Sequence, residues 1–151
     1  LVLGQRSAES FIAEPLLAHY WSPQPQLALG QALRGKATSA LDISDGLLAD
    51  CGHIALASQV RLLIDRDRVP VSLALEEFLG SAGAQQAALS GGDDYVLAFT
   101  LPERDVPTLQ ADGWPIHVIG RVVEGQGVGL LDADGQDITP AIRGYQHFHG
   151  I

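Results

Sequence analysis

The sequence predicts an α+β domain in which a mixed β-sheet is covered by helices, in α/β/α layers. Hydrophobic residues make up 46% of the 151 residues and charged residues 18%, which is enough apolar material for one packed core. Helical and strand-like patterns interleave along the chain without strict alternation. The clearest strand, at 95–100, is apolar almost throughout, which is typical of a strand covered on both faces.

The N-terminal part is expected to form two short helices and a strand. Residues 10–20 place apolar side chains on one side, and the two prolines that follow favour an extended connector. A second short helix is expected at 27–33, ending near Gly35. The chain then enters a strand at 38–43.

A helix is expected from about residue 44 to 58, because its apolar residues recur at helical spacing. Ser44 is the expected N-cap, and Asp45 in the first turn suits the positive end of the helix. Asp50, one turn further on, is interpreted as a solvated helix residue. Cys51 falls in the apolar pattern, which favours a buried small side chain over a nucleophile.

The rest of the chain is expected to be mostly strands. After a strand at 61–65, a helix at 70–79 has a proline near its start and Gly80 just past its end, and a further helical turn follows at 85–89. Further strands are expected at 95–100, 116–123, 129–132 and 137–139. The glycine-rich stretch before the last two lacks dinucleotide-site spacing and predicts a turn.

Charge and cysteine content exclude several classes of function. The formal net charge is −9 and the nine Lys and Arg are scattered, so nucleic acid is not an expected partner. An acidic protein that binds a polyphosphate needs a divalent cation held by carboxylates. No apolar run approaches the ~20 residues of a membrane span. A single cysteine fits a reducing cytoplasm. The lack of Met indicates that the chain is a fragment of a longer protein.

The first motif that points to chemistry is Asp42-Ile43-Ser44-Asp45-Gly46, at a strand-to-helix turn. The carboxylates of Asp42 and Asp45 are three residues apart and could face one metal–phosphate group. The Ser44 hydroxyl could donate to a phosphate oxygen, and helix N-termini favour anions. The alternative is a capped helix with two solvated carboxylates.

Two further motifs carry polar or aromatic groups. Ser90-Gly91-Gly92-Asp93-Asp94-Tyr95 places paired acids directly before the apolar strand, where adjacent carboxylates repel unless a cation, donor or solvent relieves them. In the tail at 144–148, Tyr145 could stack on a flat heteroaromatic ligand. The alternatives are a polar turn and a tail whose aromatic side chains dock on the core.

The order and spacing of these motifs resemble the C-terminal half of the thiamine-monophosphate kinase family, over about residues 10–149. The matching segments are 21–30, 40–47, 89–95, 118–120 and 144–148. The resemblance implies the C-terminal fold of aminoimidazole ribonucleotide synthetase, which is distantly ferredoxin-like. It also implies Mg²⁺- and ATP-dependent phosphorylation of thiamine monophosphate to thiamine diphosphate.

The same resemblance implies a role for five residues. Asp42 would be a Mg²⁺ ligand, Asp45 would bind another Mg²⁺, and Ser44 would contact an ATP phosphate. Asp93 and Tyr145 would contact thiamine monophosphate, although Asp93 stands where the family usually has the longer Glu. The family's N-terminal domain, which carries most of the Mg²⁺ and nucleotide site and forms the dimer, is absent. Residues 1–151 are therefore expected to be a single domain that is inactive alone.

Three other classes of function remain open at this point. A related ATP-dependent synthetase of the same superfamily, such as a selenophosphate or aminoimidazole ribonucleotide synthetase, would use the same acidic motifs on another substrate. A module that binds a nucleotide or thiamine phosphate without turnover, or a purely structural domain with solvated acids, would also carry them.

Overall fold

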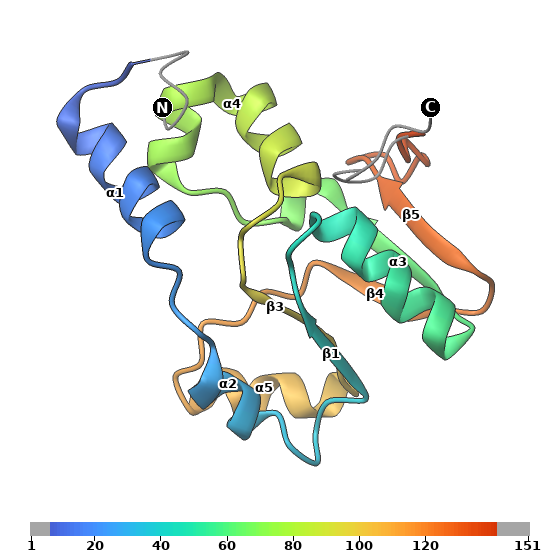
Figure 1. Cartoon of the computed structure of the whole chain (residues 1–151). Helices are drawn as coiled ribbons and strands as arrows, with labels where there is room; N and C mark the ends of the chain where they lie inside the picture. The colour runs from blue at the N-terminus through green and yellow to red at the C-terminus, as the bar shows by residue number, and fades with distance from the viewer. Residues whose placement is uncertain (1–6, 142–151) are drawn as a thin grey trace, which may run out of the picture.

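A computed structural model describes residues 7–141 of the chain (Figure 1). The elements in order are α1 (Ser10–Trp21), α2 (Leu27–Ala32), β1 (Ser39–Asp42), α3 (Leu47–Ser58), β2 (Arg61–Asp65), the 3-10 turn η1 (Arg66–Arg68), α4 (Leu73–Ser90), β3 (Leu97–Thr100), the 3-10 turn η2 (Glu103–Asp105), α5 (Val106–Ala111), β4 (Gly120–Val123) and β5 (Gly127–Leu131). None of the helices within the described residues is both long and apolar enough to span a bilayer.

The strands form two sheets. In the three-stranded sheet β2 is central, antiparallel to β4 and parallel to β5, so this sheet is mixed. β4 and β5 are consecutive in the sequence, yet β2 lies between them. β1 and β3 form a separate antiparallel pair in which Asp42 is opposite Leu97. The α+β class with a mixed sheet and helices is therefore confirmed, although the strands are divided between two sheets.

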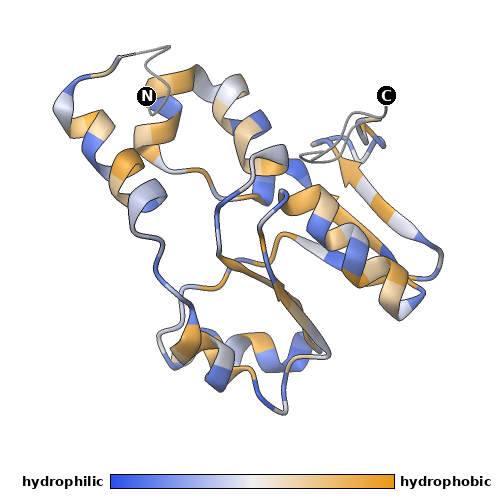
Figure 2. Cartoon of the chain, viewed as in Figure 1, coloured by the Kyte–Doolittle hydropathy of each residue, from blue (hydrophilic) through white to orange (hydrophobic). Residues whose placement is uncertain are grey.

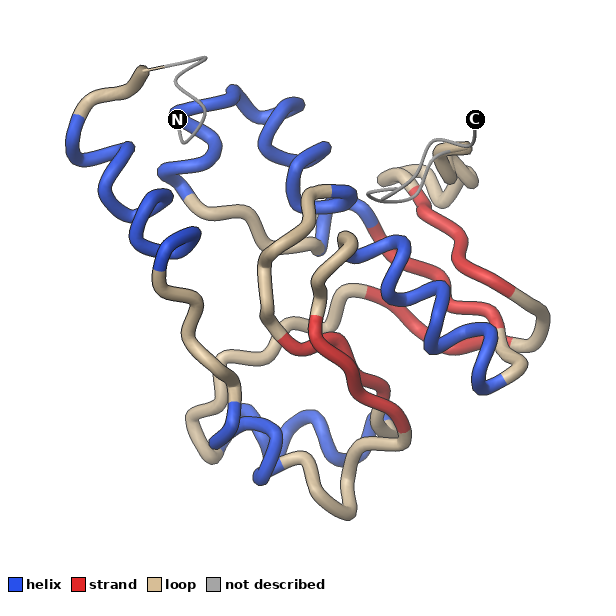
Figure 3. The backbone as a smooth tube through the Cα atoms, in the orientation of Figure 1, coloured by secondary structure: helices blue, strands red, loops and turns tan. Residues whose placement is uncertain are grey.

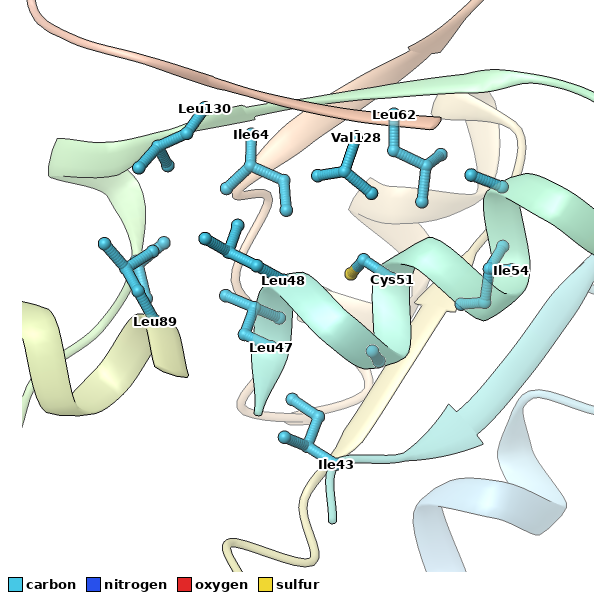
Figure 4. Packing of buried hydrophobic residues seen from close by; sticks show 13 residues of the cluster. Ile43, Leu47, Leu48, Cys51, Ile54, Leu62, Ile64, Leu89, Val128 and Leu130 are labelled. Atoms are coloured by element: carbon cyan, nitrogen blue, oxygen red, sulfur yellow. The ribbon is translucent and has the colours of Figure 1, made fainter. Parts of the chain in front are cut away.

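Helix α3 supplies the centre of the core. Its buried side chains pack against β2 and β5, as Figure 4 shows, and Leu48 at their centre is fully buried. Burying a side chain of this size stabilises the fold by about 1.5–3 kcal/mol. The buried cluster consists of Ile43, Leu47, Leu48, Cys51, Ile54, Ala55, Leu62, Ile64, Val69, Leu89, Ala98, Val128 and Leu130. Cys51 is buried there as the sequence predicts.

Two helices differ from the sequence expectation. The expected helix at 70–79 and turn at 85–89 are the two halves of α4, which kinks at Gly80, where φ is +73°. The Ser72 hydroxyl caps α4 by accepting the Leu75 N–H. Helix α5 is not expected from the sequence, which predicts no element between the strands at 95–100 and 116–123.

Candidate functional site

Two polar loops meet at one end of the β1–β3 pair. Residues 43–46 leave the end of β1, and residues 91–96 enter the start of β3 (Figure 3). The two strands are antiparallel, so both loops lie at the same end. Backbone hydrogen bonds continue the pairing: the Asp93 N–H donates to the Ser44 carbonyl at 2.9 Å, and the Tyr95 N–H to the Ile43 carbonyl at 2.8 Å. The structure thus brings the first two sequence motifs together.

The loops approach so closely that glycine is required at two places. A Cβ on Gly92 would lie 2.6 Å from the Ser44 carbonyl oxygen. A Cβ on Gly46 would lie 2.9 Å from the Ser90 carbonyl carbon, and Gly46 has a φ of +112° that L side chains rarely adopt. The glycines of both motifs therefore permit the backbones to touch.

Gly46 is also the N-cap of α3, so the expectation that Ser44 caps this helix is wrong. The helix begins at Leu47, and neither Ser44 nor Asp45 belongs to its first turn. Both residues lie in the loop before the helix, where their side chains are half-buried. Their backbone N–H groups are bound by another residue.

That residue is Asp50, and its interpretation as solvated is wrong because its exposed fraction is only 3%. Its Oδ2 accepts the Ser44 N–H at 2.9 Å and the Asp45 N–H at 3.0 Å. Side chains on a helix lean toward its N-terminus, so a first-turn carboxylate reaches the preceding loop. The sequence does hold a signal: Asp50 is three residues after Leu47 and four before Ile54, on the apolar side of the helix.

The second loop has an unusual backbone. Asp93 and Tyr95 have φ values of +62° and +55°, the left-handed region that costs a non-glycine residue about 1–3 kcal/mol. The Tyr95 hydroxyl donates to the Asp93 carboxylate at 2.9 Å. This bond raises the Tyr95 pKa, with smaller contributions from the charge of Asp93, from burial and from the charge of Asp42. Asp42, opposite Leu97 at the start of β3, lies beside this loop as well.

Helix α1 is joined to the second loop by one polar contact. His19 Nε2 lies 2.8 Å from the Asp94 carboxylate, and both side chains are about half exposed, at 51% and 46%. The contact joins residues 75 apart in the sequence. No local pattern connects them, so the sequence gives no signal for it.

The predicted site residues can now be placed. Asp42, the last residue of β1, is exposed, and so is Asp93, whereas Ser44 and Asp45 are half-buried. Ser44, Asp45 and Asp93 lie on the two adjoining loops. Tyr145 lies outside the described residues. Asp45, Asp50 and His53 have ligand atoms within 4.8 Å of one another. Carboxylate oxygens are donors that Mg²⁺ prefers, so the predicted ligands Asp42 and Asp45 fit this ion, whereas the nitrogen of His53 does not.

A second feature of the molecule is an apolar cavity of about 760 Å³, bordered by β2, β3 and β4. Its lining includes Leu62, Phe99 and Ile119, and none of the residues at 42–46 or 90–96. The cavity is thus separate from the acidic loops.

Residues 9–133 match the family model described as AIR synthase related protein, C-terminal domain. The chain is 38% identical over 146 residues to thiamine-monophosphate kinase of Escherichia coli K12, which covers 93% of the chain. It spans only 45% of that relative's length.

Solved structures agree with the sequence relatives. The crystal structure of thiamine-monophosphate kinase from Stenotrophomonas maltophilia K279a has a TM-score of 0.76 and 40% identity, over 87% of this chain and 42% of that one. AaThiL complexed with AMPPCP and TMP has a TM-score of 0.77 and 30% identity, over 97% of this chain and 45% of that one. The resemblance stated from the motifs is therefore confirmed.

Proposed function

The chain belongs to the family of the AIR synthase related protein C-terminal domain, and on that premise we propose that it is the C-terminal half of a thiamine-phosphate kinase. The complete protein would transfer a phosphoryl group from ATP to thiamine monophosphate, giving thiamine diphosphate. The observation that carries the proposal is the meeting of the loops at 43–46 and 91–96, which places the two acidic motifs side by side. A relative that binds AMPPCP and TMP supports it.

The residues at the loops suit phosphoryl transfer, which depends mainly on positioning and charge neutralisation. Asp42 and Asp45 would hold Mg²⁺, which when bound neutralises phosphate charge. The Ser44 hydroxyl would donate a hydrogen bond to an ATP phosphate oxygen. The phosphate of thiamine monophosphate is itself the nucleophile, so no side chain is assigned as a general base.

Asp93 and Tyr145 would fix the thiamine end of the substrate. Asp93 is one methylene shorter than the Glu usual in the resembling family. The Tyr95 hydroxyl donates a hydrogen bond to the exposed Asp93 carboxylate. This bond would help to orient a short side chain that has to reach a substrate.

The complete protein would supply the remaining parts of the site. The chain spans 45% of the Escherichia coli relative, and an N-terminal domain would provide further Mg²⁺ and nucleotide contacts and a homodimer interface. Phe11 and Trp21 on α1 are both 68% exposed, which is consistent with a face that another domain covers. A cytoplasmic location suits a kinase of this kind.

The test is a phosphoryl-transfer assay on the complete protein with ATP, Mg²⁺ and thiamine monophosphate, run beside the 151-residue chain. Thiamine diphosphate from the complete protein and none from the shorter chain is the expected result. A folded, metal-loaded complete protein that gives no product would contradict the proposal and point to a different substrate within the superfamily.

A further inference from the structure

We propose that Asp50 is a positioning residue: its buried carboxylate fixes the backbone at Ser44 and Asp45, so that the Asp45 carboxylate is presented to a divalent cation. The inference rests on the proposed function, because the cation is the one that phosphoryl transfer requires. It adds a residue to which the resemblance assigns no role.

The first argument is the bonding of the Asp50 carboxylate. One oxygen, Oδ2, accepts two consecutive backbone N–H groups at 2.9 and 3.0 Å. Hydrogen bonds to a carboxylate are roughly twice as strong as those between neutral groups. With an exposed fraction of 3%, the side chain is shielded from water that would otherwise compete for these bonds.

The second argument is what Asp50 connects. It lies in the first turn of α3, and its own N–H donates to the Gly46 carbonyl at 2.9 Å. The neighbouring Cys51 and Leu48 are buried in the core, so the helix cannot move independently of the sheet. Asp50 therefore attaches the turn around Gly46, where φ is +112°, to the core of the molecule.

The third argument is the position of the loop relative to the proposed ligands. The two N–H groups that Asp50 binds belong to Ser44 and Asp45, and the Ser44 carbonyl accepts the Asp93 N–H from the other loop. Fixing this backbone consequently fixes both loops. Residues that orient metal ligands in this way change metal affinity by about 10–100-fold when they are replaced.

The test is made on the complete protein with Mn²⁺ as the probe for the cation. Asp50→Asn keeps the shape of the side chain and removes its charge. Asp50→Glu keeps the charge, and Asp112→Asn removes a charge at an exposed position at the C-terminal end of α5. We expect Mn²⁺ to bind about 10–100-fold more weakly to Asp50→Asn, with partial recovery in Asp50→Glu and no change in Asp112→Asn. Melting temperatures report that each variant is folded.

A second measurement needs no variant. Hydrogen exchange in the metal-free, unaltered protein should be slower at the Ser44 and Asp45 amides than at Gly125 in the exposed β4–β5 turn. Equally fast exchange would overturn the proposal even if Asp50→Asn does not fold.

The outcomes separate this proposal from the proposed function. Mn²⁺ affinity of folded Asp50→Asn equal to that of Asp112→Asn overturns the role of Asp50 alone. An unaltered protein that binds Mn²⁺ and forms no thiamine diphosphate overturns the proposed function alone. If the unaltered protein binds no Mn²⁺, both proposals are overturned, because there is then no bound cation for Asp50 to act on.

Discussion

Helices α1 and α3 have the same length and the same apolar content, but their surroundings differ. Each has twelve residues, of which eight are apolar. Six residues of α3 are buried, whereas none of α1 is, and all twelve of its residues are described. Figure 2 shows apolar residues along both helices, while Figure 1 shows α3 against the sheet and α1 beside α4.

The difference shows that apolar content does not decide where a helix is buried. Helix α3 follows β1 in the sequence and packs against β2 and β5, so one side of the helix is enclosed. Helix α1 contacts α4 and is joined to the site by the His19–Asp94 pair. The buried helix therefore supports the acidic loops, and the exposed helix presents aromatic side chains outward.

The largest expected effect is on activity at the loops supported by α3. Asp45→Ala in the complete protein should lower kcat by about a thousandfold, because several kcal/mol of phosphate charge neutralisation is lost. Steady-state kinetics at saturating ATP and Mg²⁺ measure this. Asp112→Ala, which removes one exposed charge away from the loops, should stay near the unaltered rate. Near-normal rates in both variants would remove Asp45 from the site.

Stability should distinguish the two helices directly. Leu48→Ala, at a fully buried position on α3, should lower the free energy of unfolding by about 2–5 kcal/mol. Phe11→Ala on α1, where the side chain is 68% exposed, should change it by no more than about 0.5 kcal/mol. Urea denaturation of the 151-residue chain gives both values. Similar losses would show that α1 is packed as tightly as α3.

Glycine substitutions compare the two regions at the level of the backbone. Gly46→Ala should cost about 3 kcal/mol, since a Cβ would lie 2.9 Å from the Ser90 carbonyl carbon at a φ of +112°. Gly35, just after α2, also has a positive φ of +73°, but a Cβ there would meet no atom within 4 Å. Gly35→Ala should therefore cost only about 1 kcal/mol. Thermal denaturation measures both losses of unfolding free energy. Equal losses in Gly46→Ala and Gly35→Ala would mean that the backbone around Gly46 adjusts to a Cβ without further cost.

The smallest expected effect is the change in the free energy of unfolding at alkaline pH, which we expect from Cys51 on α3. Burial, with a further contribution from the charge of Asp50, raises the pKa of Cys51 from 9.0 to about 12. The unfolded chain releases this proton at lower pH than the folded chain, so the free energy of unfolding should fall by about 1 kcal/mol between pH 9 and 10. In Cys51→Ala, the free energy of unfolding measured by urea denaturation at each pH should not show this part of the decline. A parallel decline in both proteins would show that the thiol is not responsible.

The sequence predicts the parts of the fold that local patterns specify. Turn chemistry marks Gly80, which is where α4 kinks, and the apolar period of α3 predicts its buried side. The sequence does not predict that β2 lies between β4 and β5, because strand order depends on contacts between segments that are far apart along the chain. Nor does it predict helix α5.

The sequence by itself determined which groups are proposed to carry the chemistry: the acidic residues of the motifs at 42–46 and 90–95 and the glycines that accompany them. Only the tertiary structure decided that these motifs touch, since the contact depends on the antiparallel register of Asp42 with Leu97. It also decided the environment of Asp50. A carboxylate in a helix is solvated or buried according to the donors around it, and here the donors are two backbone N–H groups from a preceding loop.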